Sequence, residues 1–237
     1  MNTQIRTYYR KHDGFNRYLV KNRRRVHELT ELYRKNGRYF GRRVLDLACG
    51  GGILGFIIEP HGHSYVGIDI NPDMINSARA YAKRSGSKDT FIEGDTRSAK
   101  VKGTFDTVTL LGNALIHFST ESLFETLKGI QSHVHKGTFF ITDYRDVVSM
   151  LYSGKWSKKY ADMYGKRSVL SLTGGIDTRT GELLVRSESE RKHNLDFRAA
   201  IWSPFIMATI MHSNGWTLKK RETTPASDIW LEVYRKK

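Results

Sequence analysis

The sequence predicts an α/β fold: a doubly wound, seven-stranded, mostly parallel sheet with helices on both faces and an antiparallel β insert after the fifth strand. Three observations support this. Strand-like and helix-like segments alternate over residues 43–144, a glycine-rich turn follows the first strand, and several strand-like segments between residues 168 and 201 break the alternation. The length of 237 residues is ordinary for one large domain, so we expect a single domain over residues 1–237.

The alternation is preceded by a helical segment. Apolar residues recur at helical spacing over residues 15–36, and Gly37 follows as a stop signal. The five strands expected next are short apolar runs at residues 43–48, 64–69, 90–95, 105–111 and 138–144. The helices expected between them begin near Ile53, at Pro72 behind the N-cap residue Asn71, and in the amphipathic run 121–134.

A different pattern follows residue 144. Two or three strand-like segments surround the turn "DTRTGE" within residues 168–201. We therefore expect an antiparallel insert over residues 155–203 that covers a substrate cleft. A helix over residues 204–213 and two closing strands, "GWTLKKRE" and "DIWLEVYRKK", complete the expected fold.

The composition argues against several classes of protein. No apolar run approaches the ~20 residues that a membrane-spanning helix needs, and the N-terminus has no apolar signal segment. The single cysteine, Cys49, rules out an intrachain disulfide and a cysteine-based zinc site. We expect a soluble cytoplasmic protein with no membrane partner and no metal.

The net charge of +15 is concentrated near the N-terminus, where residues 1–43 hold thirteen Lys or Arg against three Asp or Glu. We expect a basic helical lid over residues 1–40. Such a charge favours anionic partners, so it indicates either a nucleic-acid surface or simply a solvated helix face. The sequence leaves both interpretations open, together with a homo-oligomer.

A nucleotide site is indicated by "VLDLACGGG" (residues 44–52), a strand that runs into a glycine turn and then a helix. Glycines let the backbone approach a ligand, and a helix N-terminus offers donors to a negative group. Asp69 ends the next expected strand, where a carboxylate can accept from two ribose hydroxyls. Gly50, Gly52 and Gly55 also match the spacing of a dinucleotide fingerprint, but "DLAC" is not expected before one.

The segment instead resembles motif I of the class I S-adenosylmethionine-dependent methyltransferases, and "FIEGDT" and "FDTVTLLGNALIHF" resemble two later motifs of that superfamily. The resemblance implies that S-adenosylmethionine is bound and S-adenosylhomocysteine released. It implies that Ala48, Gly50 and Gly52 lie under the cofactor and that Asp69 holds the ribose. The other implied contacts are Ile70 and Met74 beside the adenine, Asp95 and Thr96 at its amine, Leu111 and His117 at the methionine moiety, and Arg25 at the carboxylate, with Arg24 or Lys21 as alternatives.

Other motifs resemble the glycine and sarcosine N-methyltransferases more closely, namely "LGNALIHF", "ITDYRDVVSMLYSG", "RSVLSL" and "FRAAIWSP". This resemblance implies methyl transfer to the amine of a small molecule, an amino acid or a related carboxylate-bearing amine. It implies that Asn113 and Arg145 hold the substrate and that Tyr18 places a hydroxyl near the amine. The chain departs from the family at "RDVV" and at Ile201 and Trp202, so we expect an altered, more apolar substrate pocket.

The residues themselves support part of this picture. Asn113 follows an expected buried strand at the edge where open α/β sheets bind ligands, and its amide both donates and accepts. Asn113 and His117 would otherwise cap the next turn, and Arg145 would otherwise pair with Asp143 or Asp146. Two other functions remain open: an RNA or protein methyltransferase that uses the basic N-terminal helix as a platform, and a non-catalytic cofactor-binding module.

Overall fold

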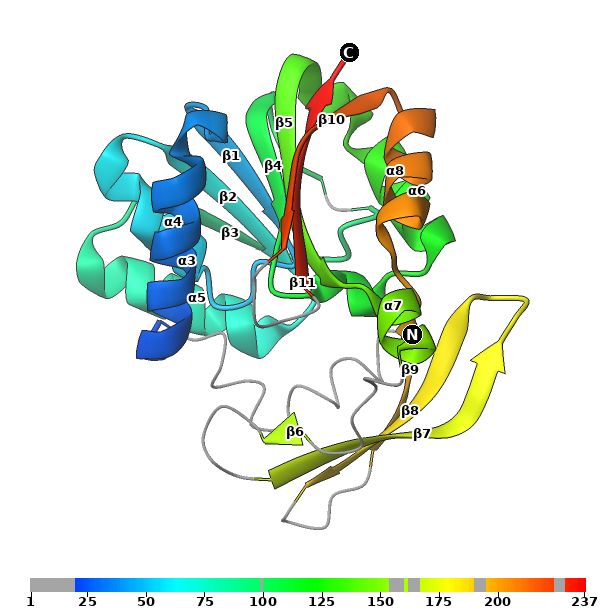
Figure 1. Cartoon of the computed structure of the whole chain (residues 1–237). Helices are drawn as coiled ribbons and strands as arrows, with labels where there is room; N and C mark the ends of the chain where they lie inside the picture. The colour runs from blue at the N-terminus through cyan, green and yellow to red at the C-terminus, as the bar shows by residue number, and fades with distance from the viewer. Residues whose placement is uncertain (1–19, 99, 154–159, 162–166, 190–194, 224–228) are drawn as a thin grey trace.

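A seven-stranded sheet forms the centre of the molecule, with the strand order β10-β11-β5-β4-β1-β2-β3 (Figure 1). The computed structural model describes residues 20–98, 100–153, 160–161, 167–189, 195–223 and 229–237. Strands β3, β2, β1, β4 and β5 pair in parallel, whereas β11 pairs antiparallel with both β5 and β10. The predicted α/β class, the mostly parallel seven-stranded sheet and the antiparallel insert are all confirmed.

The parallel strands are short and largely buried, as their apolar runs predict. Their bounds are β1 Arg43–Leu47, β2 Ser64–Asp69, β3 Thr90–Glu93, β4 Phe105–Leu110 and β5 Val134–Arg145. The closing strands are β10 Trp216–Thr223 and β11 Ile229–Lys236. Because all five parallel strands point the same way, the loops after β1, β2, β3 and β4 meet at one edge of the sheet.

Helices cover both faces of the sheet and bury one apolar cluster on each (Figure 1). One face carries α3 Arg23–Asn36, α4 Ile53–Ile58 and α5 Pro72–Ser85. The other face carries α6 Thr120–Gly129 and α8 Pro204–Ser213. Burial of both faces explains why the strands read as continuous apolar runs rather than as alternating ones.

Three elements differ from the sequence prediction by more than two residues at one end. The first described helix begins at Arg23 rather than at residue 15, because Asn22 is its N-cap and accepts a hydrogen bond from the backbone N of Arg25. Helix α6 ends at Gly129 instead of continuing to residue 134. Strand β5 is longer than predicted, and Arg145 is its last residue, paired with Ile229 of β11.

The insert is a separate four-stranded antiparallel sheet with the order β6-β7-β8-β9. Its strands are β6 Tyr160–Ala161, β7 Arg167–Asp177, β8 Glu182–Ser189 and β9 Leu195–Ala200, and the predicted turn joins β7 to β8. Phe197, Leu183 and Val185 form a small apolar cluster that packs against Ile116, just after β4. The insert therefore contacts the edge of the main sheet where the loops converge.

Within the residues that the structure describes, no helix is long and apolar enough to cross a membrane.

Candidate functional site

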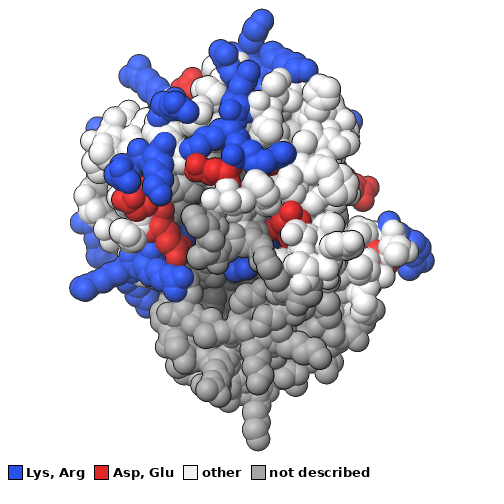
Figure 2. Space-filling model, in the orientation of Figure 1, with Lys and Arg blue, Asp and Glu red and all other residues white. Residues whose placement is uncertain are grey.

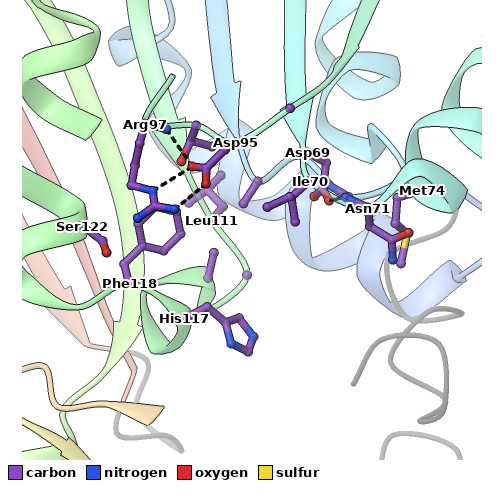
Figure 3. Close-up of a pocket in the computed structure, with 16 residues that line it drawn as sticks. Asp69, Ile70, Asn71, Met74, Asp95, Arg97, Leu111, His117, Phe118 and Ser122 are labelled. Carbon is purple, nitrogen blue, oxygen red and sulfur yellow. Dashed lines mark hydrogen bonds and ion pairs between the residues drawn. The ribbon is translucent and has the colours of Figure 1, made fainter. Parts of the chain in front are cut away.

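A pocket opens at the carboxyl ends of the parallel strands, where four loops meet (Figure 3). Its walls come from the turns after β1, β2 and β3, from the segment after β4, and from α6. Nine of the residues predicted to bind the cofactor line it: Ala48, Gly50, Asp69, Ile70, Met74, Asp95, Thr96, Leu111 and His117. Sequence reasoning missed seven others: Asn71, Gly94, Arg97, Gly112, Ala114, Phe118 and Ser122.

The turn after β1 brings the backbone to the pocket through left-handed residues. Ala48 has a φ of 54° and Gly50 a φ of 56°. A non-glycine residue in this region costs energy, so Ala48 is a strained residue at the pocket floor. Gly52, also left-handed, is not among the lining residues; a Cβ there would lie 2.2 Å from the ring of Phe91. Gly52 thus has a packing role at the start of α4, and its predicted place beneath the cofactor stays a prediction.

Asp69 joins the first two loops at the pocket. Its Oδ2 accepts from the backbone N of Gly50 and its Oδ1 from the backbone N of Asn71, each at 2.8 Å. Burial raises the pKa of Asp69, and the two backbone donors oppose that rise. Each carboxylate oxygen retains a further lone pair, so the side chain can still accept from a vicinal diol while its position is fixed.

Asn71 carries a buried donor beside Asp69. Its Oδ1 accepts from the backbone N of Asp73 at 3.0 Å and caps α5, which fixes the orientation of the side-chain amide. The side chain is buried, and its Nδ2 has no hydrogen-bond partner among the described residues. A buried donor without a partner is costly, and a ligand acceptor in the pocket would satisfy it.

At the other end of the pocket, Asp95 is tied to Arg97. Two guanidinium nitrogens of Arg97 bind the Asp95 carboxylate, at 3.0 Å and 2.6 Å, and the backbone N of Arg97 binds it at 3.0 Å (Figure 3). This bidentate pairing lowers the pKa of Asp95. Asp95 is therefore held as a carboxylate at neutral pH, and Arg97 fixes how it faces the pocket.

A short 3₁₀ helix, η3 Ala114–His117, forms the wall after β4. The buried indole of Trp202 holds it in place, because its Nε1 donates to the carbonyl oxygens of Leu115 and Phe118 at 2.7 Å and 3.0 Å. His117 of η3 lies 6.3 Å from the Phe197 ring of the insert. Burial lowers the pKa of His117 to about 4, so its imidazole is neutral at physiological pH.

Asn113 and Arg145 come together at the ends of β4 and β5, next to the pocket but not among its lining residues. The Asn113 side-chain Oδ1 accepts from the backbone N of Arg145 at 3.0 Å, and the backbone N of Asn113 donates to Asp143 at 2.8 Å. Asn113 is left-handed, with a φ of 57°, and its side chain makes no cap bond to η3. The alternative that it only caps the following helix is therefore wrong.

Two predicted residues remain, Tyr18 and Arg25. Tyr18 lies outside the described residues. Arg25 is buried on α3, donates to Glu28 at 3.2 Å, and is not a lining residue. Burial raises the pKa of Asp46 on β1 to about 6, and the charge of Arg25 opposes that rise. The charge of Arg25 is thus close enough to affect Asp46, on a strand beneath the pocket. Arg24, the alternative predicted partner of the cofactor carboxylate, is exposed and pairs with Glu28.

The residues present suit an adenosyl ligand. Asp69 offers acceptors for a diol, the orphaned Nδ2 of Asn71 offers a donor beside it, and Ile70, Met74 and Leu111 supply apolar walls. Of the missed residues, Asn71 had the plainest signal, since it stands two positions after Asp69, but sequence reasoning gave it only a capping role.

Comparison with known proteins supports this assignment of the fold. Residues 44–137 match the methyltransferase domain family. The ubiquinone biosynthesis O-methyltransferase of Vibrio parahaemolyticus is 34% identical over 85 residues, which are 35% of this chain and 36% of that protein. The chain thus matches about a third of the length of such curated relatives.

Two solved structures match almost the whole chain. The PH0226 protein of Pyrococcus horikoshii OT3 has a TM-score of 0.73 and 27% identity over 97% of this chain and 98% of its own. An S-adenosylmethionine-dependent methyltransferase of Clostridium acetobutylicum has a TM-score of 0.73 over 96% of this chain and 98% of its own, and its 13% identity makes this a likeness of fold alone. Residues 44–137 therefore match the methyltransferase domain family, and the pocket at their strand ends offers the acceptors, the donor and the apolar walls that suit an adenosyl cofactor.

Proposed function

We propose that this protein transfers a methyl group from S-adenosylmethionine to the amine of a small molecule that also bears a carboxylate, such as an amino acid. The observation that carries the proposal is the geometry of Asn113. Its Oδ1 is occupied by the backbone N of Arg145, so its Nδ2 is the part of the amide left to bind a ligand. Among the described residues, none accepts a hydrogen bond from that nitrogen.

A carboxylate is the group that suits this arrangement. The Nδ2 of Asn113 offers two donors at the pocket mouth, and the Arg145 side chain begins at the neighbouring strand end. Two carboxylates stand close to Arg145 in the sequence: Asp143 accepts from the backbone N of Asn113, and Asp146 accepts from the backbone N of Ser149 and from the Trp230 indole. A guanidinium and an amide on adjacent strands are a common way to hold a carboxylate in a fixed orientation.

The chemistry asks the protein mainly for alignment. Bound S-adenosylmethionine supplies an electrophilic methyl group, so no strong protein nucleophile is required. Asp69, Asn71 and the apolar side chains of the pocket would fix the cofactor, while Asn113 and Arg145 would orient the acceptor. Placing two reactants in near-attack geometry can lower a barrier by ~7–11 kcal/mol. The small apolar cluster of the insert, against which Ile116, Leu151 and Ile201 pack, would help to exclude water.

The amine must arrive without its extra proton, and the pocket offers little help in removing it. Because the pKa of His117 is lowered to about 4, its imidazole is a weak base. We therefore assign His117 to packing against the cofactor. The rate of transfer should rise with pH as the free amine becomes more abundant, with an apparent pKa that follows the acceptor when acceptors are exchanged.

A macromolecular acceptor is the rival, since the net charge of +15 favours anionic partners. The described part of the N-terminal basic segment argues against α3 as its platform. Arg24 pairs with Glu28, Arg34 pairs with Glu31, and Arg25 is buried. Of the five Lys and Arg residues on this helix, two are therefore paired within the helix at exposed positions and a third is buried.

The direct test is transfer of a labelled methyl group. One reaction receives a pool of amino acids and small amines, including glycine and sarcosine, and a second receives total RNA and protein. Label in amino acids is the expected result. Label only in a macromolecule would overturn the proposal and favour the rival.

Asn113→Asp then tests the carboxylate contact. Aspartate keeps the acceptor for the Arg145 backbone and tolerates the left-handed φ, but it replaces the donor by a negative charge. A lost charge-assisted hydrogen bond is worth ~1.5–3 kcal/mol, so the KM of the carboxylate substrate should rise about 100-fold, with cofactor affinity unchanged. An acceptor amine without a carboxylate is the control and should lose little. An unchanged KM for the amino acid would remove Asn113 from the substrate site.

A further inference from the structure

The end of the sheet opposite the pocket carries a group of basic side chains, which we call the amino edge: Arg38, Arg42, Arg43, Lys102, Lys136 and Arg235. Arg43 begins β1, Lys102 precedes β4, Lys136 lies near the start of β5 and Arg235 near the end of the antiparallel β11. Figure 2 shows Lys and Arg side chains gathered at the end of the molecule where the C-terminus lies in Figure 1.

The members of the amino edge are neighbours in space. Arg43 Nη2 donates to the carbonyl oxygen of Lys102 at 3.1 Å. Gly137, next to Lys136, has the Arg235 guanidinium 3.6 Å from where its Cβ would be. The rings of Tyr39 and Phe139 lie 5.2 Å apart and connect the Arg38 side to the Arg235 side. The cations therefore form one continuous surface across the adjacent strands β1, β4, β5 and β11.

Three of the guanidinium groups are supported by aromatic rings. Arg38 lies 4.8 Å from the Tyr39 ring centre, Arg43 5.0 Å from that of Phe105, and Arg235 6.0 Å from that of Phe139. A stacked guanidinium has lost much of its rotational freedom already. One nitrogen of Arg38 donates to the Tyr39 hydroxyl and one of Arg43 to the Lys102 carbonyl, and a guanidinium has further N–H donors besides these. Such groups lose less entropy when they bind an anion than an unsupported lysine would.

The acidic content of the amino edge is low. Asp106 is the carboxylate that contacts these groups directly: it accepts from the backbone N of Arg43 and lies 3.1 Å from the ring nitrogen of His135. The hydrogen bond of His135 with the backbone carbonyl of Lys136, and after it the contact with Asp106, raise the pKa of His135, so His135 adds positive charge as the pH falls. The remaining cations therefore act together on whatever lies outside the surface.

We propose that the amino edge binds nucleic acid through its phosphodiester backbone. Neighbouring strands lie ~4.8 Å apart, so four strands spread these cations over ~14 Å. Phosphates of one strand in a duplex follow each other at ~3.4 Å along the axis, so this span faces about four of them. Planar, pre-oriented guanidinium forks match phosphate oxygens, which are the groups that a nucleic acid presents along its backbone.

This surface is an anchor and not the reaction site. A strand of six residues such as β4 separates it from the cofactor pocket by roughly 20 Å. The inference is therefore independent of which acceptor the pocket methylates, and its test needs no turnover.

The test measures binding of a fluorescent 20-nucleotide RNA to the full chain as a function of salt. Arg42→Gln, Lys102→Gln and Arg235→Gln are combined in one variant. Each phosphate contact contributes about −0.7 to the slope of log K against log salt concentration. The loss of three contacts should therefore make the slope less steep by about 2 units and weaken the affinity at 0.1 M salt by about 100-fold. Single-stranded DNA of the same length should bind with a similar affinity and a similar dependence on salt, because the contacts are to phosphate.

The matched control combines Lys83→Gln, Arg84→Gln and Lys88→Gln, which are exposed and change the net charge equally. Arg84 lies 5.9 Å from the Tyr81 ring, so a stacked arginine is removed there too. The control should lose far less affinity than the amino-edge variant. Equal losses in both variants, tighter binding to anionic lipid vesicles than to RNA, or strong preference for RNA over DNA would each overturn the proposal. Circular dichroism would verify that both variants are folded.

Discussion

Asn71 combines two functions in one side chain at the residue scale. The amide oxygen caps α5, and the amide nitrogen is buried at the pocket, where the described residues offer it no acceptor. The cap belongs to the folding of the chain, whereas the nitrogen is useful only when a ligand is present. The two functions can be separated by mutation because different atoms carry them.

Asn71→Ser should weaken binding of S-adenosylhomocysteine without lowering stability. Serine keeps an acceptor for the cap, but it lacks the donor, whose hydrogen bond is worth ~0.5–1.5 kcal/mol. The dissociation constant, measured by titration calorimetry, should rise roughly 3- to 10-fold. Asn71→Ala removes the cap as well and should also lower the free energy of unfolding by ~1 kcal/mol. Wild-type affinity in Asn71→Ser would show that the buried nitrogen does not contact the cofactor.

His117 makes stability depend on pH. Its pKa is lowered to about 4 in the folded protein, whereas an imidazole in the unfolded chain keeps a pKa of ~6.5. Only the unfolded state takes up the proton between these values, so this contribution is present above pH 6.5 and is lost as the pH falls toward 4. The difference in unfolding free energy between the wild type and His117→Gln should shrink over that range in urea titrations. A constant difference would contradict the assignment.

At the scale of elements, the turn between β1 and α4 depends on a glycine for two reasons. Gly52 has a φ of 73°, and its Cα approaches the Phe91 ring so closely that a Cβ would overlap with it. Gly62 has a φ of 88° with nothing within 4 Å of a Cβ. Alanine substitutions at Gly52 and Gly62 can therefore be compared to separate the cost of a left-handed backbone from the cost of steric overlap.

Gly62→Ala should cost only the left-handed penalty of ~1–2 kcal/mol. Gly52→Ala should cost that amount plus ~1–3 kcal/mol, because the Phe91 ring must shift inside the core between the sheet and α4. Urea unfolding of the two variants measures the difference. Equal losses would show that the turn relaxes freely and that Gly52 is not a packing constraint.

On the scale of the whole molecule, cofactor binding should stabilise the fold. S-adenosylhomocysteine at 100 times its dissociation constant adds ~2.7 kcal/mol to the unfolding free energy. For a chain of this size that corresponds to a rise in Tm of about 5–10 °C, measured by calorimetry. NAD at the same concentration is the control, because the glycine spacing alone also fits a dinucleotide. An equal or larger shift with NAD would contradict the assignment of the pocket.

Several elements were predicted from local signals alone. Strand β2, helix α5 between Asn71 and Gly86, and helix α8 have the predicted bounds, because apolar runs, an N-cap, a following proline and a terminal glycine act within a few residues. Helix α3 was predicted too long, because the apolar spacing continues through residues 20–22, where Asn22 ends the helical pattern. The nine pocket residues followed from motifs that stand at strand ends, and strand ends converge in a parallel sheet.

The sequence by itself determined the parallel sheet, the glycine turn and the strand-end residues, since periodicity and turn chemistry are local properties. Only the tertiary structure decided the contacts between distant segments. It showed Trp202 holding η3 across 87 and 84 residues of chain, Asn113 joined to the Arg145 backbone, and cations from four strands meeting at the amino edge. It also placed Gly52 against the ring of Phe91. These outcomes depend on which strands are neighbours and on which atoms packing leaves without a partner, and no local pattern encodes either.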